Sequence, residues 1–178
     1  HFIRSSDTEF LFIEDQEQFD KILEIDVHRA KIKRLMVFDP KGLRDEAFMG
    51  LLSYEDLLLL GRKSHAKHIG KLTKLYASVN EKDTALMVFT SGSTGLPKAA
   101  EISHANFYAA CALSTQLFEE LPQNTNILSY LPLCHIAEQN MTVVNSLASR
   151  HIMNFGESLR TVALDLRDVA PELFFGVP

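Results

Sequence analysis

Short apolar runs alternate with segments of helical periodicity along most of the chain. Six runs have strand character, at residues 10–13, 35–38, 85–89, 127–131, 152–155 and 173–175. Between them, apolar residues recur about every three to four positions, the spacing at which an amphipathic helix buries one face. Strands joined by helices of this length need crossover connections. The pattern therefore predicts an α/β fold in which helices flank a largely parallel sheet.

Several predicted helices begin at polar residues that can cap the first backbone amides. Asp15 and Ser53 each precede an apolar run and have a suitable capping partner three residues later. The most periodic segment follows Ser103, where apolar residues fall at helical spacing. Further helices are predicted within residues 136–147 and 159–169, and Pro171 ends the second.

A basic segment follows the helix predicted after Ser53. Its cations are Arg62, Lys63, Lys67, Lys71 and Lys74. We interpret the segment as a connector and place a possible subdomain boundary near residues 62–82. Its charge suits either a solvated helix face or a peripheral contact with an anionic lipid surface. His65 and His68 lie in the same segment, where no third ligand accompanies them, so no metal site is predicted.

Composition and charge narrow the possible partners. With 178 residues, 46% hydrophobic and 23% charged, the chain has the composition of a globular protein. A net charge of −5 argues against nucleic acid, because that affinity comes mainly from Lys and Arg. Cys111 and Cys134 fit neither a zinc spacing nor a disulfide framework, which favours a reducing, cytoplasmic location. No apolar run reaches the roughly 18 to 20 residues that cross a bilayer.

The segment FTSGSTGLPK at residues 89–98 carries the clearest chemistry. It follows an apolar strand and combines two glycines, four hydroxyl residues and a lysine. Glycines let backbone amides turn toward a phosphate, hydroxyls add donors, and the lysine adds a mobile positive charge. The residues of this predicted phosphate loop are Thr90, Ser91, Gly92, Ser93, Thr94, Gly95 and Lys98.

Two other interpretations of the loop are weaker. A plain surface turn also uses Ser, Thr and Gly, but it does not explain a lysine placed directly after Gly-x-Pro. The nucleotide loop of P-loop NTPases requires Gly-Lys-Ser/Thr running straight into a helix, and that motif is absent. Pro97 and the short apolar stretch at 99–102 instead predict a second strand, which makes a β-loop-β element.

The loop resembles the motif of the adenylate-forming superfamily, aromatic-Thr-Ser-Gly-Ser/Thr-Thr-Gly-x-Pro-Lys-Gly. Residues 89–98 fit at ten successive positions, and Ser-His-Ala-Asn at 103–106 matches the Ser/Thr-His-x-Asn that follows. Ala99 stands where the family nearly always has glycine, which predicts a slightly stiffer backbone after the lysine. LPLCHIAE at 131–138 is similar to the Leu-Pro-Leu-x-His-x-x-Glu of long-chain fatty-acid ligases.

Segments 14–18, 37–39 and 174–178 are also similar to regions of those ligases. The resemblance therefore covers nearly the whole chain and favours the long-chain fatty-acid--CoA ligase branch of the AMP-forming acyl-CoA synthetases. It implies that residues 1–178 are an internal part of the large N-terminal AMP-binding domain. An isolated chain of these residues is expected to be catalytically inactive.

The resemblance implies a two-step reaction. ATP activates a fatty acid to acyl-AMP with release of pyrophosphate, and coenzyme A then takes the acyl group as a thioester. ATP, Mg²⁺ and coenzyme A are the implied cofactors and co-substrates. Lys98 and His135 are the implied catalytic residues, and His135 and Glu138 the implied substrate-binding residues. An enzyme acting on a fatty substrate also suits a peripheral position at the inner membrane face.

Alternatives stay open at each of these points. His135 also suits a helix-start histidine packed against the preceding strand, and Glu138 a first-turn acid favoured by the helix dipole. The alternative function is a stand-alone, non-catalytic module that binds a nucleotide or phosphate through the same loop.

Overall fold

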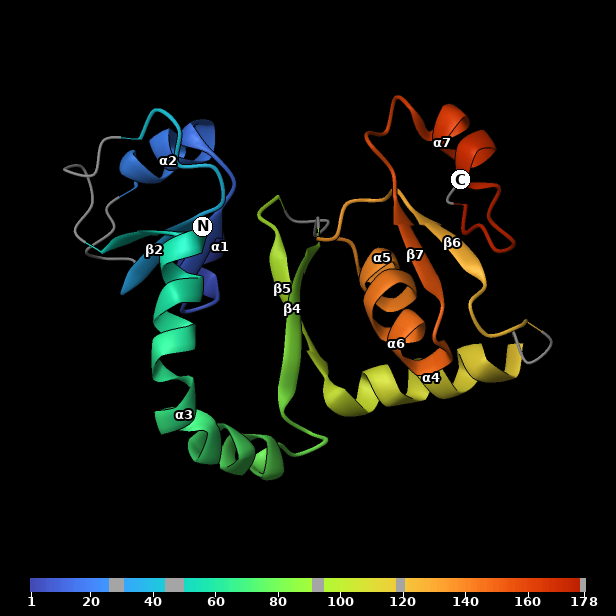
Figure 1. The fold of residues 1–178 in the computed structure, drawn as a ribbon, viewed down its shortest axis with the longest axis horizontal. Coiled ribbons are helices and arrows are strands. Elements are labelled where there is room, and N and C mark those ends of the chain that lie inside the picture. The colour runs from blue at the N-terminus through green and yellow to red at the C-terminus, as the bar shows by residue number, and fades with distance from the viewer. Residues whose placement is uncertain (26–30, 44–49, 91–94, 118–120, 177–178) are drawn as a thin grey trace. The chain divides into compact units, whose positions relative to one another are not determined.

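The computed structural model describes residues 1–25, 31–43, 50–90, 95–117, 121–176. The chain divides into two compact units, His1–Val79 and Asn80–Pro178, which we describe separately. Both contain strands and helices, as the ribbon in Figure 1 shows, and the predicted α/β class is confirmed.

The first unit is built on a parallel sheet in the order β1-β2-β3. Leu35 in the central strand pairs with Leu11 on one side and Leu51 on the other. In chain order the elements are α1 (Phe2–Ser5), β1 (Phe10–Ile13), α2 (Gln16–Leu23), β2 (Arg34–Val37), β3 (Leu51–Ser53) and α3 (Tyr54–Ser78).

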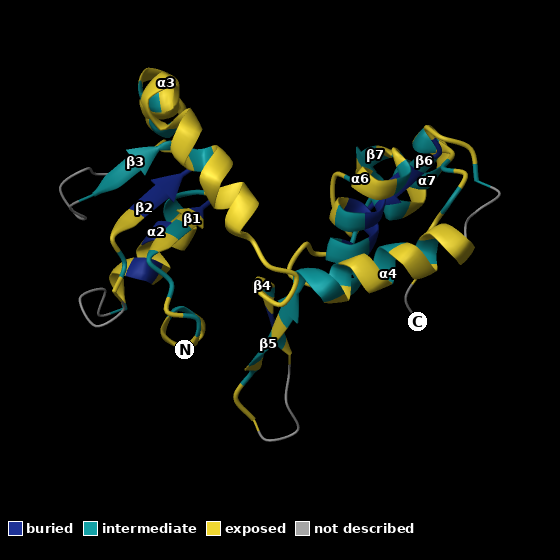
Figure 2. Cartoon of the chain, turned by 90° about the horizontal axis from the view of Figure 1, so that it is seen from below, coloured by how far each residue is buried: buried dark blue, intermediate teal, exposed yellow. Residues whose placement is uncertain are grey.

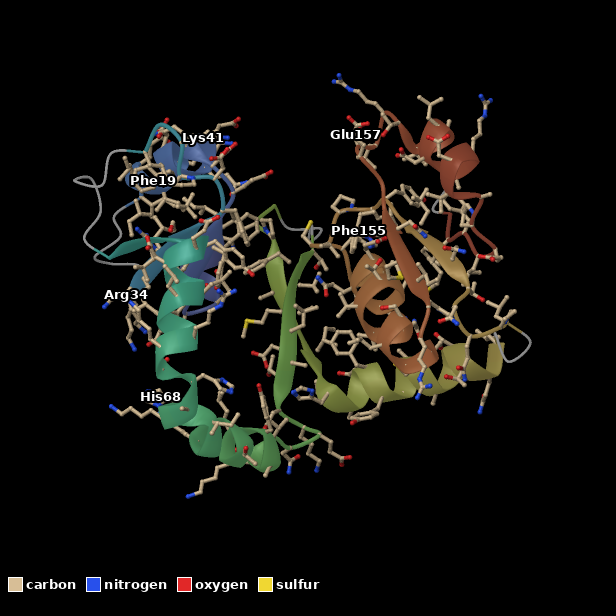
Figure 3. The ribbon with its side chains drawn as sticks, in the orientation of Figure 1. Phe19, Arg34, Lys41, His68, Phe155 and Glu157 are labelled. Carbon is tan, nitrogen blue, oxygen red and sulfur yellow. The ribbon has the colours of Figure 1, made fainter. Side chains whose placement is uncertain are left out.

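The core of this unit lies between the sheet and α2. Leu35 is 0% exposed and Phe19 is 1% exposed, and Ile13, Ile22 and Val37 complete the buried cluster. Figure 2 shows the burial concentrated in β2 and α2, and Figure 3 shows where Phe19 lies. The α2 helix begins as predicted, because the Asp15 carboxylate accepts a hydrogen bond from the Gln18 amide at 3.1 Å.

The α3 helix corrects one interpretation of the sequence. The Ser53 hydroxyl caps it as predicted, accepting from the Asp56 amide at 3.1 Å. The helix then continues to Ser78, so residues 62–74 do not form a separate connector but the solvated helix face that the sequence left open. None of its residues is buried, and Figure 2 shows the helix almost entirely exposed. The basic residues do not interrupt it because Lys and Arg have good helix propensity.

The second unit combines an antiparallel hairpin with a parallel strand pair. β4 pairs with β5, and β6 pairs with β7. α4 and α6 both contact η2, a wider π-helix that continues α5. The elements are β4 (Thr84–Thr90), β5 (Lys98–Ser103), α4 (His104–Leu117), β6 (Asn126–Ser129), α5 (Ile136–Glu138), η2 (Gln139–Asn145), α6 (Ser146–Ser149), β7 (Ile152–Phe155) and α7 (Val162–Val169).

The strand expected at residues 173–175 was wrong. Leu173 makes only an isolated parallel bridge to Ile127. Side chains take the neighbouring backbone groups instead: the Asn126 amide donates to the Glu172 carboxylate at 2.6 Å, and the Tyr130 hydroxyl donates to the Phe175 carbonyl at 3.1 Å. A ladder cannot extend where these partners are already used.

We expect Leu35→Ala to lower the free energy of unfolding of the first unit by about 2 to 5 kcal/mol, because it leaves a cavity in a closed core. Leu59→Ala is the matched control, since Leu59 is 49% exposed on α3. Its effect should stay within about 0.5 kcal/mol. Urea denaturation followed by far-UV circular dichroism measures both. Equal losses for the two variants would contradict the assigned core.

Candidate functional site

The β4–β5 hairpin sets the two ends of the glycine-rich loop opposite each other. Thr90, the last residue of β4, pairs with Lys98, the first residue of β5, and both side chains are exposed. The antiparallel register of the pairs before them fixes this position. The predicted site residues Ser91, Gly92, Ser93 and Thr94 lie outside the described residues.

Gly95 has a backbone that favours glycine. Its φ is +101°, a conformation that residues with a Cβ rarely adopt. Ala99, by contrast, lies within β5 opposite Phe89. Alanine adopts extended backbone without strain, so the position where the family nearly always has glycine is accommodated here as an ordinary strand residue.

The turn from β6 to α5 is held by three hydrogen bonds. The His135 amide donates to the Pro132 carbonyl at 2.9 Å, and the Gln139 side-chain amide donates to the Leu133 carbonyl at 2.6 Å. His135 is the N-cap of α5, and its Nδ1 accepts from the Ala137 amide at 3.2 Å. This histidine therefore starts the helix, as one interpretation of the sequence anticipated, but its side chain is exposed.

His135 also lines a hollow together with Thr90. The hollow has a volume of about 410 Å³ and opens between the end of β4 and the β6–α5 turn. Two motifs that lie far apart in the sequence thus meet in one site. Its described lining residues are Val88, Phe89, Thr90, Leu131, Pro132, Cys134, His135 and Ile136.

A second hollow shares one lining residue, Ile136, with the first. Its volume is about 600 Å³, and β5, α4, α5 and η2 contribute to its wall. Apolar residues dominate the lining through Ile102, Phe107, Ala110 and Ile136. Such a wall suits an apolar ligand group, because burying it removes apolar surface from water.

The profile described as AMP-binding enzyme matches residues 1–178. The chain belongs to the AMP-binding enzyme family. This agrees with the resemblance of the loop at 89–98, and the match extends over both units of the chain.

The chain is also similar to individual members of the AMP-binding family. It is 28% identical to Long-chain-fatty-acid--CoA ligase ACSBG2 of Homo sapiens, over 100% of this chain and 26% of the relative. The chain thus spans about a quarter of that relative's length. ATP-bound MatB from Rhodopseudomonas palustris has a TM-score of 0.62 at 20% identity, covering 99% of this chain and 31% of the other.

A second solved structure has the same fold. It is the A-PCP didomain of carboxylic acid reductase from Segniliparus rugosus in complex with AMP. The TM-score is 0.66 at 18% identity, and the match covers 96% of this chain and 25% of the other. At these identities the two structures establish the fold, which is that of the adenylate-forming enzymes.

Glu138 does not lie in the wall of either hollow. It is 3% exposed, and its carboxylate accepts hydrogen bonds from the hydroxyls of Ser129, at 2.5 Å, and Thr142. A buried carboxylate is tolerated only when it is hydrogen-bonded, and these two donors satisfy that need. Of the sequence-predicted residues, Thr90 and His135 line the same hollow, and Lys98 pairs with Thr90 in the hairpin. Glu138 is buried and lines neither hollow.

The described residues hold no group of three or more His, Cys, Asp or Glu that could bind a metal. His68 lies on α3, as Figure 3 shows, on the exposed surface of the first unit. Among the helices that the structure describes, none has the length and apolar character to span a bilayer.

Sequence reasoning missed most of the wall of the first hollow. Cys134 was given no role in the site, although it lies within the motif at 131–138; it is exposed and lines the hollow beside His135. Ser129 and Thr142 were missed as partners of Glu138. Thr142 had a usable signal, since it follows Glu138 by four residues on the helix, but Ser129 had none.

We expect Cys134 to be alkylated at least about tenfold faster than Cys111, because thiolate character and access control thiol reactivity. Cys111 is half-buried, its thiol donates to the Val144 carbonyl at 3.7 Å, and burial raises its pKa. A raised pKa leaves less thiolate at neutral pH, so Cys111 should gain reactivity only in more alkaline solution. Iodoacetamide labelling with mass spectrometry at several pH values measures both rates. Faster labelling of Cys111 at neutral pH would contradict the geometry.

Proposed function

We propose that this chain is part of an AMP-forming acyl-CoA synthetase of the long-chain fatty-acid type. The enzyme joins a fatty acid to AMP with release of pyrophosphate and then transfers the acyl group to coenzyme A. One observation carries the proposal: within a chain that matches the AMP-binding family over residues 1–178, the phosphate-loop strand and His135 meet in one hollow. We place all 178 residues in the N-terminal AMP-binding domain.

The first step needs a site that offsets repulsion between two anions. A carboxylate must approach a triphosphate, so fixed amide and hydroxyl donors and a cation have to stabilise the charge as it moves. Thr90 and Lys98, paired at the base of the loop, flank the place where the sequence puts the donors of residues 91–94. We assign this group to the β- and γ-phosphates and to the leaving pyrophosphate.

Mg²⁺ enters this scheme as part of the substrate. The described residues provide no cluster of carboxylates for a resident ion, and the buried Glu138 carboxylate is occupied by two hydroxyls. The phosphates of ATP are themselves good oxygen ligands for Mg²⁺. We therefore assign the ion to the ATP complex.

We assign the carboxylate of the acid substrate to the first hollow and its acyl chain to the second. His135 lies in the first hollow with Thr90, where it can donate a hydrogen bond to the carboxylate of the acid. Ile136 lines both hollows, and we assign the acyl chain to the second, whose lining is largely apolar. The name of the Homo sapiens relative supports a long-chain acid. A non-catalytic phosphate-binding module would need only the hairpin.

We also propose a peripheral contact of α3 with an anionic membrane surface. Residues 57–78 carry five Lys and Arg residues and no acid, in a chain whose net charge is −5. Lys63, Lys67 and Lys74 fall on one helix face, and exposed Leu58 and Ile69 lie near the opposite face. The two free cysteines support a reducing compartment, so the proposed location is the cytoplasm and its membrane face.

We expect Lys98→Ala to slow adenylate formation by the complete protein by about 10²- to 10³-fold, because it removes a cation from the pyrophosphate leaving group. The measurements are ATP–pyrophosphate exchange and hydroxamate trapping across carboxylic acids of increasing length. Lys82→Ala is the control: it removes the same charge from an exposed residue just before β4. Undiminished exchange in Lys98→Ala would contradict the phosphate role. Absence of any trapped hydroxamate from the unaltered protein would contradict the proposed function.

The membrane contact predicts a charge-dependent partition onto vesicles. Replacing Lys63, Lys67 and Lys74 with Gln should weaken binding to phosphatidylserine-containing vesicles roughly a hundredfold, since each Lys contributes about 1 kcal/mol near an anionic surface. The matched control replaces Lys21, Lys33 and Lys41, which already pair with acids, and changes net charge equally. Vesicle co-sedimentation measures both variants. Equal weakening would show a net-charge effect and contradict α3 docking.

A further inference from the structure

Glu138 is a buried acid for which the proposed reaction has no use. Its side chain is 3% exposed, and one carboxylate oxygen accepts hydrogen bonds from both Ser129 and Thr142. Both hydroxyl residues are themselves buried, at 6% and 5% exposed. Hydroxyls that donate to a carboxylate make charge-assisted hydrogen bonds, which are stronger than bonds between neutral groups. The three side chains therefore form a closed polar cluster in the interior of the second unit.

This cluster joins the two elements that flank the His135 turn. Ser129 is the last residue of β6, where ligand sites of α/β proteins commonly lie, and Thr142 belongs to η2. Glu138 is the last residue of the single turn α5, directly between them. The Gln139 side chain adds a bond to the Leu133 carbonyl within the same turn. The start of α5 is thereby held against the end of β6 from both sides.

The hydrogen bonds of this turn fix which nitrogen of the His135 ring carries the hydrogen. The Ala137 amide is 3.2 Å from Nδ1 and can only donate, so Nδ1 accepts and carries no hydrogen. In the neutral imidazole the hydrogen must then lie on Nε2. Because the ring lines the hollow beside Thr90, the polar atom it has left for a ligand is an Nε2–H donor. A carboxylate or an acyl phosphate oxygen is the acceptor that matches it.

We infer that Glu138 is a positioning residue for His135. Its carboxylate anchors the first turn of α5 to β6 and η2, and this anchoring holds His135 as an Nε2–H donor in the hollow. This inference rests on the proposed function for the identity of the acceptor, the carboxylate of the acid substrate. It assigns Glu138 no contact with substrate, because Glu138 lies outside the described lining of both hollows.

The test compares Glu138→Gln with Glu138→Ala in the complete protein. Glutamine keeps an acceptor oxygen for Ser129 and Thr142, whereas alanine removes it and leaves both hydroxyls without that partner. We expect the alanine variant to lose roughly a hundredfold in kcat for adenylate formation, the effect of a misplaced catalytic group, with KM for ATP unchanged. The glutamine variant should stay within about tenfold of the unaltered kcat, because neutral hydrogen bonds are weaker than charge-assisted ones.

A second measurement does not depend on activity. The ¹⁵N resonances of the His135 ring, assigned by difference from His135→Asn, report which nitrogen carries hydrogen. The unaltered protein and Glu138→Gln should show a protonated Nε2 and a bare Nδ1, and Glu138→Ala should show mixed tautomers. If the protein forms no adenylate at all, the proposed function fails, and the tautomer result still decides the role of Glu138.

Thr125→Val is the structural control. Thr125 is 2% exposed, and its hydroxyl donates to the Pro122 carbonyl just before β6 begins. This variant should lose stability without changing the His135 resonances. Where Glu138→Ala fails to fold, Thr142→Val removes one donor and should give a smaller shift in the same direction. The inference is overturned if alanine leaves the tautomer and kcat unchanged, or if glutamine is as damaging as alanine in both measurements.

Discussion

A buried carboxylate is the constraint on which the site depends. Glu138 lies in the interior with two hydroxyl donors, one at the end of a strand and one on a helical segment. Removing an ionised group from water is costly unless its hydrogen bonds are replaced, so the three side chains can occupy only a narrow set of relative positions. That restriction fixes the β6–α5 turn between them. The turn in turn places His135 in the hollow that the end of β4 also lines.

The hairpin and the turn contribute different chemistry to the same hollow. β4 and β5 form a rigid ladder that ends with Thr90 opposite Lys98, so one hydroxyl and one cation lie at the base of the loop. The turn supplies an imidazole whose Nδ1 is already used by the Ala137 amide. Under the proposed function, a phosphate side and a carboxylate side are therefore built on separate elements. A site that joins two anionic groups requires this kind of division, because each must be neutralised where it lies.

The sequence could predict the elements whose signals are local. Asp15 and Ser53 begin helices because a capping hydrogen bond spans only three residues. The sequence left residues 62–74 open between a connector and a solvated helix face, since a run of lysines is common in both. β3 is only three residues long, too short to show a period. Residues 173–175 have strand composition, but Glu172 and Tyr130 use the backbone groups that a ladder would need.

By itself the sequence determined the family and the α/β class, because composition and short spacings specify which groups are present and which local backbone they prefer. Only the tertiary structure decided which of those groups meet. Thr90 and His135 are far apart in the chain, and their common hollow depends on the register of one hairpin and on one anchored turn. Whether Glu138 faced solvent or the interior was likewise decided by Ser129, whose hydroxyl reaches it only after β6 and α5 have packed together.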